Sequence, residues 1–109
     1  MVKLVVIDFD GTLKPYSERI VSERAIEYIE EAVKNGITFA VSSGRTYSEL
    51  ISFLPQLKDK IYFICSDGAY YIKNGKTLYE RAIASSDLSY FASEKNGVVF
   101  YGAHRNYAP

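Results

Sequence analysis

Two adjoining stretches decide the fold: VKLVVI at Val2–Ile7 and, directly after it, DFDGT at Asp8–Thr12. The apolar run, broken by a single lysine, is typical of a strand buried in a parallel sheet. Gly11 then favours a turn, so the carboxylates of Asp8 and Asp10 arrive together where the strand ends. Ligands of open α/β sheets bind at this carboxyl edge. Because burying unpaired charge costs several kcal/mol, the acid pair indicates a functional site.

The composition is that of an ordinary globular domain. The 109 residues suffice for one domain with a core, and 48% of them are hydrophobic. Thirteen basic residues balance thirteen acidic ones, so no overall field favours nucleic acid or an anionic membrane as a partner. We therefore expect recognition of a negatively charged substrate to be local.

The chain is expected to be cytoplasmic. Its single cysteine, Cys65, excludes an intrachain disulfide and suits a reducing compartment. No apolar run approaches the ~20 residues of a membrane span. The N-terminus also lacks the apolar stretch and cleavage site of a signal peptide.

Apolar runs and capping residues predict alternating strands and helices in the first part of the chain. Strand, helix and strand in that order predict a βαβ unit with parallel strands. The expected elements are a helix from Ser22 to Lys34, a strand at Ile37–Val41, a short helix that begins at Thr46 and is ended by Pro55, and a strand at Ile61–Cys65.

The pattern changes after the third predicted strand. Asn74-Gly75 between two strand-like runs predicts a β-hairpin. A boundary is expected near Ala84. The other expected elements are hairpin arms at Tyr70–Ile72 and Thr77–Ile83, a helix from Ser85 or Ser86 to Lys95, a strand at Val98–Tyr101 and a loose end at His104–Pro109.

The acid pair suits phosphoryl transfer. An aspartate carboxylate can attack phosphorus and form an aspartyl-phosphate. A second acid protonates the leaving oxygen and later deprotonates a water. Asp8 and Asp10 fit these two roles. Their oxygens also favour Mg²⁺, which would offset the repulsion between Asp8 and a phosphate.

A phosphate-binding loop is expected after the second predicted strand. The hydroxyl of Ser43 and the backbone N–H groups of Ser43 and Gly44 can hold phosphate oxygens near a helix N-terminus. Arg45 can add a fork of donors to a phosphate or substrate oxygen. Asp67 follows the third predicted strand and is expected at the same edge.

These motifs resemble those of the haloacid dehalogenase (HAD) superfamily of phosphohydrolases. DFDGT is similar to its motif I, and AVSSGR at Ala40–Arg45 is similar to its motif II. Ser66–Ala69 (SDGA) stands where relatives often have Asn-Gly-Ala, which points to the Cof-like sugar-phosphatase branch with cap type C2B. The resemblance implies an α/β fold, a three-layer (Rossmannoid) parallel-sheet core that is incomplete here. A β-hairpin and the start of an α+β cap would follow.

The resemblance also assigns roles. It implies Asp8 as nucleophile and Asp10 as general acid/base, both at a Mg²⁺ site in which Asp10 contributes its backbone carbonyl. Ser43 would bind the phosphate, and Asp67 would face the substrate. The implied substrate is a sugar phosphate or similar small metabolite. Residues 1–84 would form the partial catalytic core and residues 85–109 the beginning of the cap.

The motif III lysine and the motif IV acidic pair have no counterpart in the sequence. We therefore expect a piece of a longer enzyme, weak or inactive alone. In the family the motif I strand is central, so one of its edges would be unpaired here. Exposed edges recruit partners, which predicts self-association.

Three other functions fit parts of this pattern. A phosphotransferase similar to phosphomannomutase would use the same nucleophile and differ in its acceptor. A receiver-like signalling module would phosphorylate Asp67, with Asp8 and Asp10 as metal ligands, but it leaves Ser43–Arg45 unexplained. A non-catalytic remnant would bind phosphate without hydrolysing it.

Overall fold

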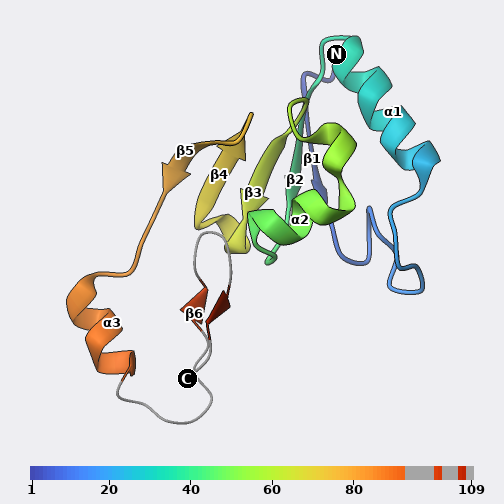
Figure 1. Ribbon diagram of the computed structural model, residues 1–109. Helices are drawn as coiled ribbons and strands as arrows, with labels where there is room; N and C mark the ends of the chain where they lie inside the picture. Colours follow the sequence, from blue (N-terminus) through green and yellow to red (C-terminus); the bar gives the residue numbers. More distant parts are fainter. Residues whose placement is uncertain (93–99, 102–105, 108–109) are drawn as a thin grey trace.

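The computed structural model describes residues 1–92, 100–101 and 106–107 (Figure 1). Strands and helices alternate in the first half, and short elements follow a hairpin. The strands are β1 (Leu4–Asp8), β2 (Thr38–Ser42), β3 (Tyr62–Cys65), β4 (Tyr70–Lys73), β5 (Lys76–Glu80), β6 (Phe100–Tyr101) and β7 (Asn106–Tyr107). The helices are α1 (Glu23–Lys34), α2 (Tyr47–Phe53) and α3 (Ser85–Ala92), with 3₁₀ turns η1 (Pro55–Leu57) and η2 (Ser66–Gly68).

Five strands form one mixed sheet in the order β1-β2-β3-β4-β5. The β1–β2 and β2–β3 pairs are parallel, as the βαβ pattern predicts, whereas β3–β4 and β4–β5 are antiparallel. The register sets Asp8 opposite Ser42, and Ser42 opposite Ile64. The carboxyl ends of the three parallel strands therefore meet at one edge.

Caps define both helices of the first half, as the sequence predicts. Ser22 Oγ accepts a hydrogen bond from the Ala25 amide (3.1 Å) at the start of α1. At the start of α2, the Thr46 amide donates to the Glu49 carboxylate (2.9 Å) and the Glu49 amide donates back to Thr46 Oγ1 (3.4 Å). This reciprocal capping box fixes where α2 begins. Pro55 follows directly after its C-cap.

The β4–β5 hairpin turns at Asn74 and Gly75, whose φ angles are 53° and 72°. Two successive positive φ angles are those of a type I′ turn, which matches the twist of paired strands. Tyr71 and Tyr79 stack across the hairpin with ring centres 4.9 Å apart. The second arm is shorter than predicted, since β5 ends at Glu80.

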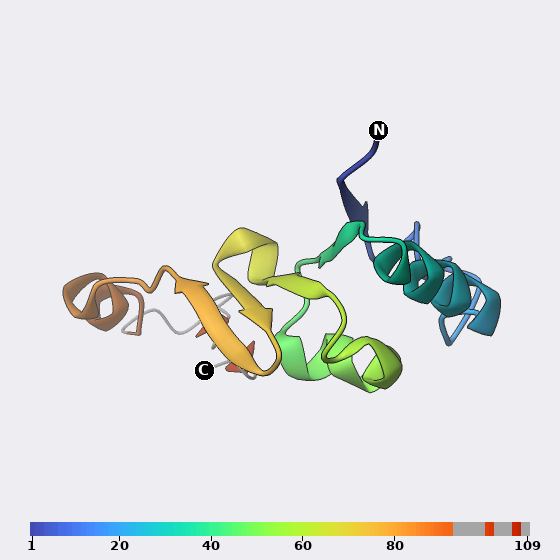
Figure 2. The same ribbon diagram turned by 90° about the horizontal axis from the view of Figure 1, so that it is seen from above.

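Helices α1 and α2 pack on the same face of the sheet (Figure 2). The buried core lies between them and the inward side chains of the strands. It includes Phe9, Ile26, Ile29, Phe39, Val41, Leu50, Leu54, Ile61, Phe63, Cys65 and Ile72. The α/β class is confirmed. The described residues supply two layers, sheet and helices, of the three-layer core that the family resemblance implies.

The opposite face of the sheet is apolar and is covered by no helix among the described residues. Leu4, Val6 and Leu78 are 58%, 53% and 57% exposed there. With Tyr71 and other side chains of that face they line a shallow groove of about 270 Å³. Within the described sheet β1 is an edge strand, as expected for the motif I strand of an incomplete core.

The last part of the chain differs from the prediction in one respect. A two-residue strand, β7, pairs antiparallel with β6 where a loose end was expected, with Phe100 opposite Tyr107. Aromatic residues favour such pairing. The remainder of the predicted helix beyond Ala92, residues 98–99 of the predicted strand, and His104 lie outside the described residues. In the described part of the chain, every helix is too short or too polar to cross a membrane.

Candidate active site

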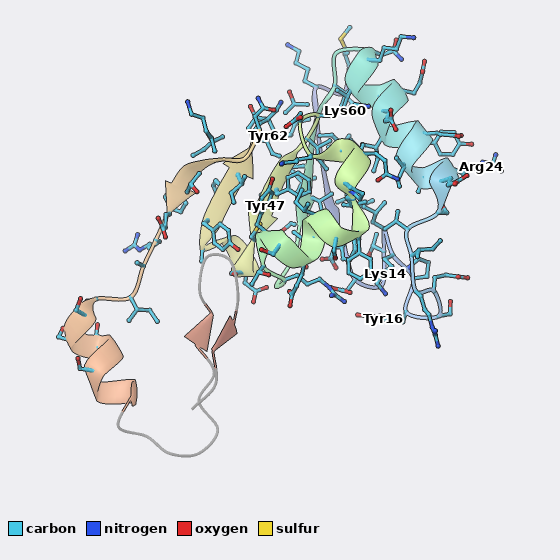
Figure 3. All side chains as sticks on the ribbon, viewed as in Figure 1. Lys14, Tyr16, Arg24, Tyr47, Lys60 and Tyr62 are labelled. Carbon is cyan, nitrogen blue, oxygen red and sulfur yellow. The ribbon has the colours of Figure 1, made fainter. Side chains whose placement is uncertain are left out.

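The candidate site lies at the carboxyl edge of the three parallel strands. Asp8 is the exposed last residue of β1. Phe9 follows it, fully buried, and its amide donates to the Ser42 carbonyl of β2 (3.1 Å). Figure 3 shows the side chains of Lys14 and Tyr16, from the loop after β1, at the opposite end of the sheet from Lys60 and Tyr62.

The loop after β1 is closed by its own backbone. The amides of Leu13 and Lys14 donate to the carbonyls of Asp8 (3.2 Å) and Phe9 (2.9 Å), and the Gly11 amide donates to the Lys14 carbonyl (2.8 Å). Gly11 has φ +78°, and a Cβ there would lie 2.5 Å from the Tyr16 ring. The positive φ favours glycine at this position, and any other residue would also displace the exposed Tyr16 ring. The result is a tight turn that presents two aspartates.

Arg45 pairs directly with Asp10. Arg45 Nε lies 2.9 Å from Asp10 Oδ2, and Arg45 Nη2 lies 3.0 Å from Asp10 Oδ1. Both side chains are 32% exposed. The hydrogen bonds from Arg45 lower the pKa of Asp10, and the same contact raises the pKa of Arg45. Arg45, which the sequence predicts as a donor to a phosphate or substrate oxygen, is thus paired with an aspartate of the predicted acid pair.

Ser43 is buried and organises its own loop. Its Oγ accepts a hydrogen bond from the Arg45 amide (3.1 Å), and its amide donates to the Ile64 carbonyl of β3 (3.0 Å). A hydroxyl that accepts in this way retains its own proton for donation. The predicted phosphate-binding residues Ser43, Gly44 and Arg45 therefore sit in a loop that is anchored to β3.

The loop after β3 is bound to the same loop. The Ser66 amide donates to the Arg45 carbonyl (2.9 Å), and the Asp67 amide donates to the Ser43 carbonyl (3.0 Å). A Cβ on Gly44 would lie 3.1 Å from Asp67 Oδ1, so the Asp67 carboxylate lies against Gly44. The structure thus brings Asp67 to the edge that carries the other predicted site residues.

The backbone of this loop is strained. Ser66 and Asp67 have φ angles of 47° and 56°, a left-handed conformation that costs non-glycine residues roughly 1–2 kcal/mol each. The Ser66 hydroxyl is buried without a hydrogen-bond partner among the described residues. Strain of this kind is concentrated at functional sites. A Ser-Asp-Gly sequence predicts a turn with positive φ at Asp67 and Gly68, but it gives no signal for the positive φ of Ser66.

Two further residues contact the site and were not singled out in the sequence. The centre of the Phe53 ring lies 5.0 Å from Arg45 Cζ. Lys14 is 8% exposed, and its Nζ donates to the Glu18 carbonyl (3.1 Å). Phe53 lies on α2, and helical spacing cannot distinguish a core aromatic from one that contacts a site.

The donor set at this edge fits a hard cation in part. Asp8 and Asp10 supply carboxylate oxygens, and Mg²⁺ is commonly held by one or two carboxylates together with waters and substrate phosphate. Among residues 1–92 and the two short described strands, no group of three or more His, Cys, Asp or Glu side chains is placed to hold a metal ion. Because the Asp10 carboxylate is paired with Arg45, the described residues would offer a Mg²⁺ ion the Asp8 carboxylate and the Asp10 backbone carbonyl.

The chain belongs to the haloacid dehalogenase-like hydrolase family, whose model matches residues 5–108. It is 32% identical over 78 residues to the 5-amino-6-(5-phospho-D-ribitylamino)uracil phosphatase YbjI of Escherichia coli, covering 72% of this chain and 29% of that protein. It is 35% identical over 95 residues to a phosphoglycolate phosphatase of Thermoplasma volcanium, covering 87% of this chain and 38% of that protein. The chain therefore spans about a third of the length of these phosphatases.

Solved structures agree with the family. A HAD subclass IIB sugar phosphatase, BT4131, superposes with a TM-score of 0.73 at 28% identity, covering 96% of this chain and 43% of that one. The predicted family membership is thus confirmed. The predicted fold class is confirmed as well.

Proposed function

We propose that this chain carries the nucleophile and phosphate-binding part of a Mg²⁺-dependent phosphomonoester hydrolase. The enzyme would act through an aspartyl-phosphate, on a sugar phosphate or a similar small metabolite. The single observation that carries the proposal is the register of the sheet. It sets Asp8, at the end of β1, opposite Ser42, directly before the Ser43–Arg45 loop.

The proposed reaction has two steps. An Asp8 oxygen attacks phosphorus, the bond from phosphorus to the leaving alcohol oxygen breaks, and Asp10 gives that oxygen a proton. Asp10 then takes a proton from a water that attacks the aspartyl-phosphate, which releases inorganic phosphate and restores Asp8. Splitting one displacement into two lowers each barrier.

The phosphate would be held by the loop after β2. The hydroxyl of Ser43 and the backbone N–H of Gly44 would bind its oxygens. The paired Arg45 keeps Asp10 ionised, and an ionised carboxylate cannot donate a proton. An arriving phosphate gives Arg45 a second anion to bind, so we propose that Arg45 moves from Asp10 to the phosphate.

Mg²⁺ would be bound by Asp8 and by the backbone carbonyl of Asp10, and it would neutralise charge between Asp8 and the phosphate. Asp67 would contact the alcohol part of the substrate from beside Gly44. Specificity for a particular phosphomonoester would come from the cap.

We assign residues 1–84 to the partial catalytic core and residues 85–109 to the beginning of the cap. The assignment is supported by the continuity of β1 to β5 in one sheet and by an irregular segment at 81–84 before α3. Buried Cys65 is compatible with a cytoplasmic location.

The chain alone is expected to be weakly active or inactive, because it lacks a motif III lysine.

The chain is also proposed to self-associate with a second copy through β1. An unpaired strand edge presents free backbone groups to another chain. Leu4 and Val6 stand exposed beside that edge, on a face whose groove is lined by no charged side chain. An uncharged patch is self-complementary, which is what a two-fold contact requires.

Replacement of Asp8 by asparagine tests the proposed chemistry. In the intact enzyme, Asp8→Asn is expected to abolish turnover of a generic phosphomonoester such as p-nitrophenyl phosphate. The same replacement at Asp67 is expected to leave turnover measurable and to change the Michaelis constant. Full activity of the Asp8→Asn variant would exclude Asp8 as the nucleophile.

A further inference from the structure

We propose that Phe53 is a positioning residue of the active site, whose ring fixes the Arg45 guanidinium where it meets Asp10. Phe53 is the last residue of α2 and lies outside both motifs. This role rests on the proposed function, in which Arg45 binds the phosphate of the substrate.

Two aromatic rings form a surface under the guanidinium. Arg45 Cζ lies 5.0 Å from the centre of the Phe53 ring and 5.6 Å from the centre of the Phe9 ring. The two rings are in contact, with centres 5.3 Å apart and planes inclined by 54°. Phe9 is fully buried, so it anchors the two rings to the core. It also lies between Asp8 and Asp10 in the sequence.

The ring contacts offset part of the entropy cost of ordering the arginine. A cation within about 6 Å of an aromatic ring centre gains roughly 0.5–1 kcal/mol at an exposed site. An arginine side chain carries about 2 kcal/mol of rotamer entropy, which any bidentate contact must overcome. With the rings on one side and Asp10 on the other, Arg45 keeps few other orientations. Its donor fork is therefore held at the site beside Asp10, within reach of an arriving phosphate.

The same ring also contacts a cation from the loop after β1. Lys14 Nζ lies 5.9 Å from the centre of the Phe53 ring. The ring thus joins the loop that carries Asp10 to the loop that carries Arg45. Phe53 is half-buried, so it can fill this role without being part of the closed core.

The test compares Phe53→Leu with Phe53→Tyr in the 109-residue chain. Leucine keeps an apolar side chain but removes the ring, whereas tyrosine keeps the ring. The readout is the NMR signal of the Arg45 Nε–Hε group, its chemical shift and its rate of proton exchange with water. A ring next to the guanidinium shifts this signal, and a fixed ion pair slows its exchange.

We expect Phe53→Leu to move the Arg45 signal and to speed its exchange about two- to fivefold, which corresponds to the loss of roughly 0.5–1 kcal/mol. Phe53→Tyr should restore the signal. Ile51→Ala is the matched control, since Ile51 also packs from α2 against the core. That replacement should lower the midpoint of thermal unfolding and leave Arg45 unchanged.

An Arg45 signal that is the same in Phe53→Leu as in the unaltered chain would overturn the positioning role. An equal change of the Arg45 signal in Ile51→Ala would also overturn it, because the effect of Phe53 would then be one of general packing. Turnover does not enter these readouts. Failure of Asp8→Asn to stop hydrolysis would therefore contradict the proposed function and leave the role of Phe53 to be decided by the NMR signal alone.

Discussion

Arg45 holds Asp10 by three hydrogen bonds, from Nε to Oδ2 at 2.9 Å and to Oδ1 at 3.2 Å, and from Nη2 to Oδ1 at 3.0 Å. The residues are 35 positions apart in the sequence. The contact links the loop after β1 to the loop after β2. Because one partner belongs to motif I and the other to motif II, the two motifs form one electrostatic unit before any substrate binds.

Removing the guanidinium should change how stability responds to acid. The hydrogen bonds from Arg45 hold the pKa of Asp10 below its ordinary value of 3.8. A carboxyl whose folded pKa is lowered stabilises the fold above its unfolded pKa, and that stability is lost as the pH falls through the folded pKa. We expect Arg45→Met to reduce the loss of unfolding free energy on acidification below about pH 4.

Urea unfolding of Arg45→Met and of the unaltered chain, at several values between about pH 2.5 and 6, would measure how the unfolding free energy of each depends on pH. Arg24→Met serves as the control, since Arg24 is exposed on α1 and contacts Tyr28 rather than an acid. Parallel pH profiles for the Arg45→Met variant and the unaltered chain would contradict the effect.

Loss of the capping box should destabilise α2. Thr46 is buried and its hydroxyl accepts from the Glu49 amide. Thr46→Ala is expected to lower the unfolding free energy by about 1 kcal/mol, as for other helix N-caps. Thr46→Ser keeps the hydroxyl and should retain most of the stabilisation that the cap provides. The exposed neighbour Ser48 provides the control, and Ser48→Ala should change stability by less than about 0.5 kcal/mol. Equal midpoints of urea unfolding for Thr46→Ala and Ser48→Ala would argue against the cap.

Cys65 should be inert in the folded chain. Burial raises the pKa of its thiol to about 12, so at about pH 8 roughly one molecule in ten thousand carries the reactive thiolate. We expect no reaction with a disulfide reagent under native conditions and complete reaction of one thiol in denaturant. Cys65→Ser identifies the thiol. Rapid labelling of the native protein would show that β3 is open at this position.

Besides a small phosphorylated metabolite, the chain is proposed to bind a second copy of itself. Sedimentation of the 109-residue chain is expected to give a dimer that dissociates on dilution. Val6→Lys should yield a monomer, because it places a charge on the uncovered face. Tyr28→Lys is the matched control, since Tyr28 is 61% exposed, against 53% for Val6, but lies on α1, on the face of the sheet that the helices cover. A monomer at all concentrations for the unaltered chain would exclude this contact.

The sequence predicts the scaffold of the site well because local signals determine it. The apolar strands, the Ser22 cap, the Thr46 capping box and the Asn74-Gly75 turn each depend on a few neighbouring residues, and each is confirmed. The parallel pairing of β1 with β2 then brings the two motifs together without further information.

Contacts between distant side chains could not be predicted in the same way. Arg45 was expected to meet phosphate, and its pairing with Asp10 depends on the shape of two loops. The helical pattern of α2 gives no indication that the Phe53 ring lies beside a guanidinium. The positive φ of Ser66 has no local cause in its sequence and follows from hydrogen bonds to the Ser43–Arg45 loop.

Which aspartate accepts the phosphoryl group decides whether Asp8 is the nucleophile. Fluoroberyllate, a mimic of a phosphoryl group, is added with Mg²⁺ to the unaltered chain and to Asp8→Asn and Asp67→Asn, and bound fluoride is followed by fluorine NMR. We expect a bound signal in the unaltered chain and in Asp67→Asn, and none in Asp8→Asn. A signal that persists in Asp8→Asn and disappears in Asp67→Asn would contradict it and make Asp67 the acceptor.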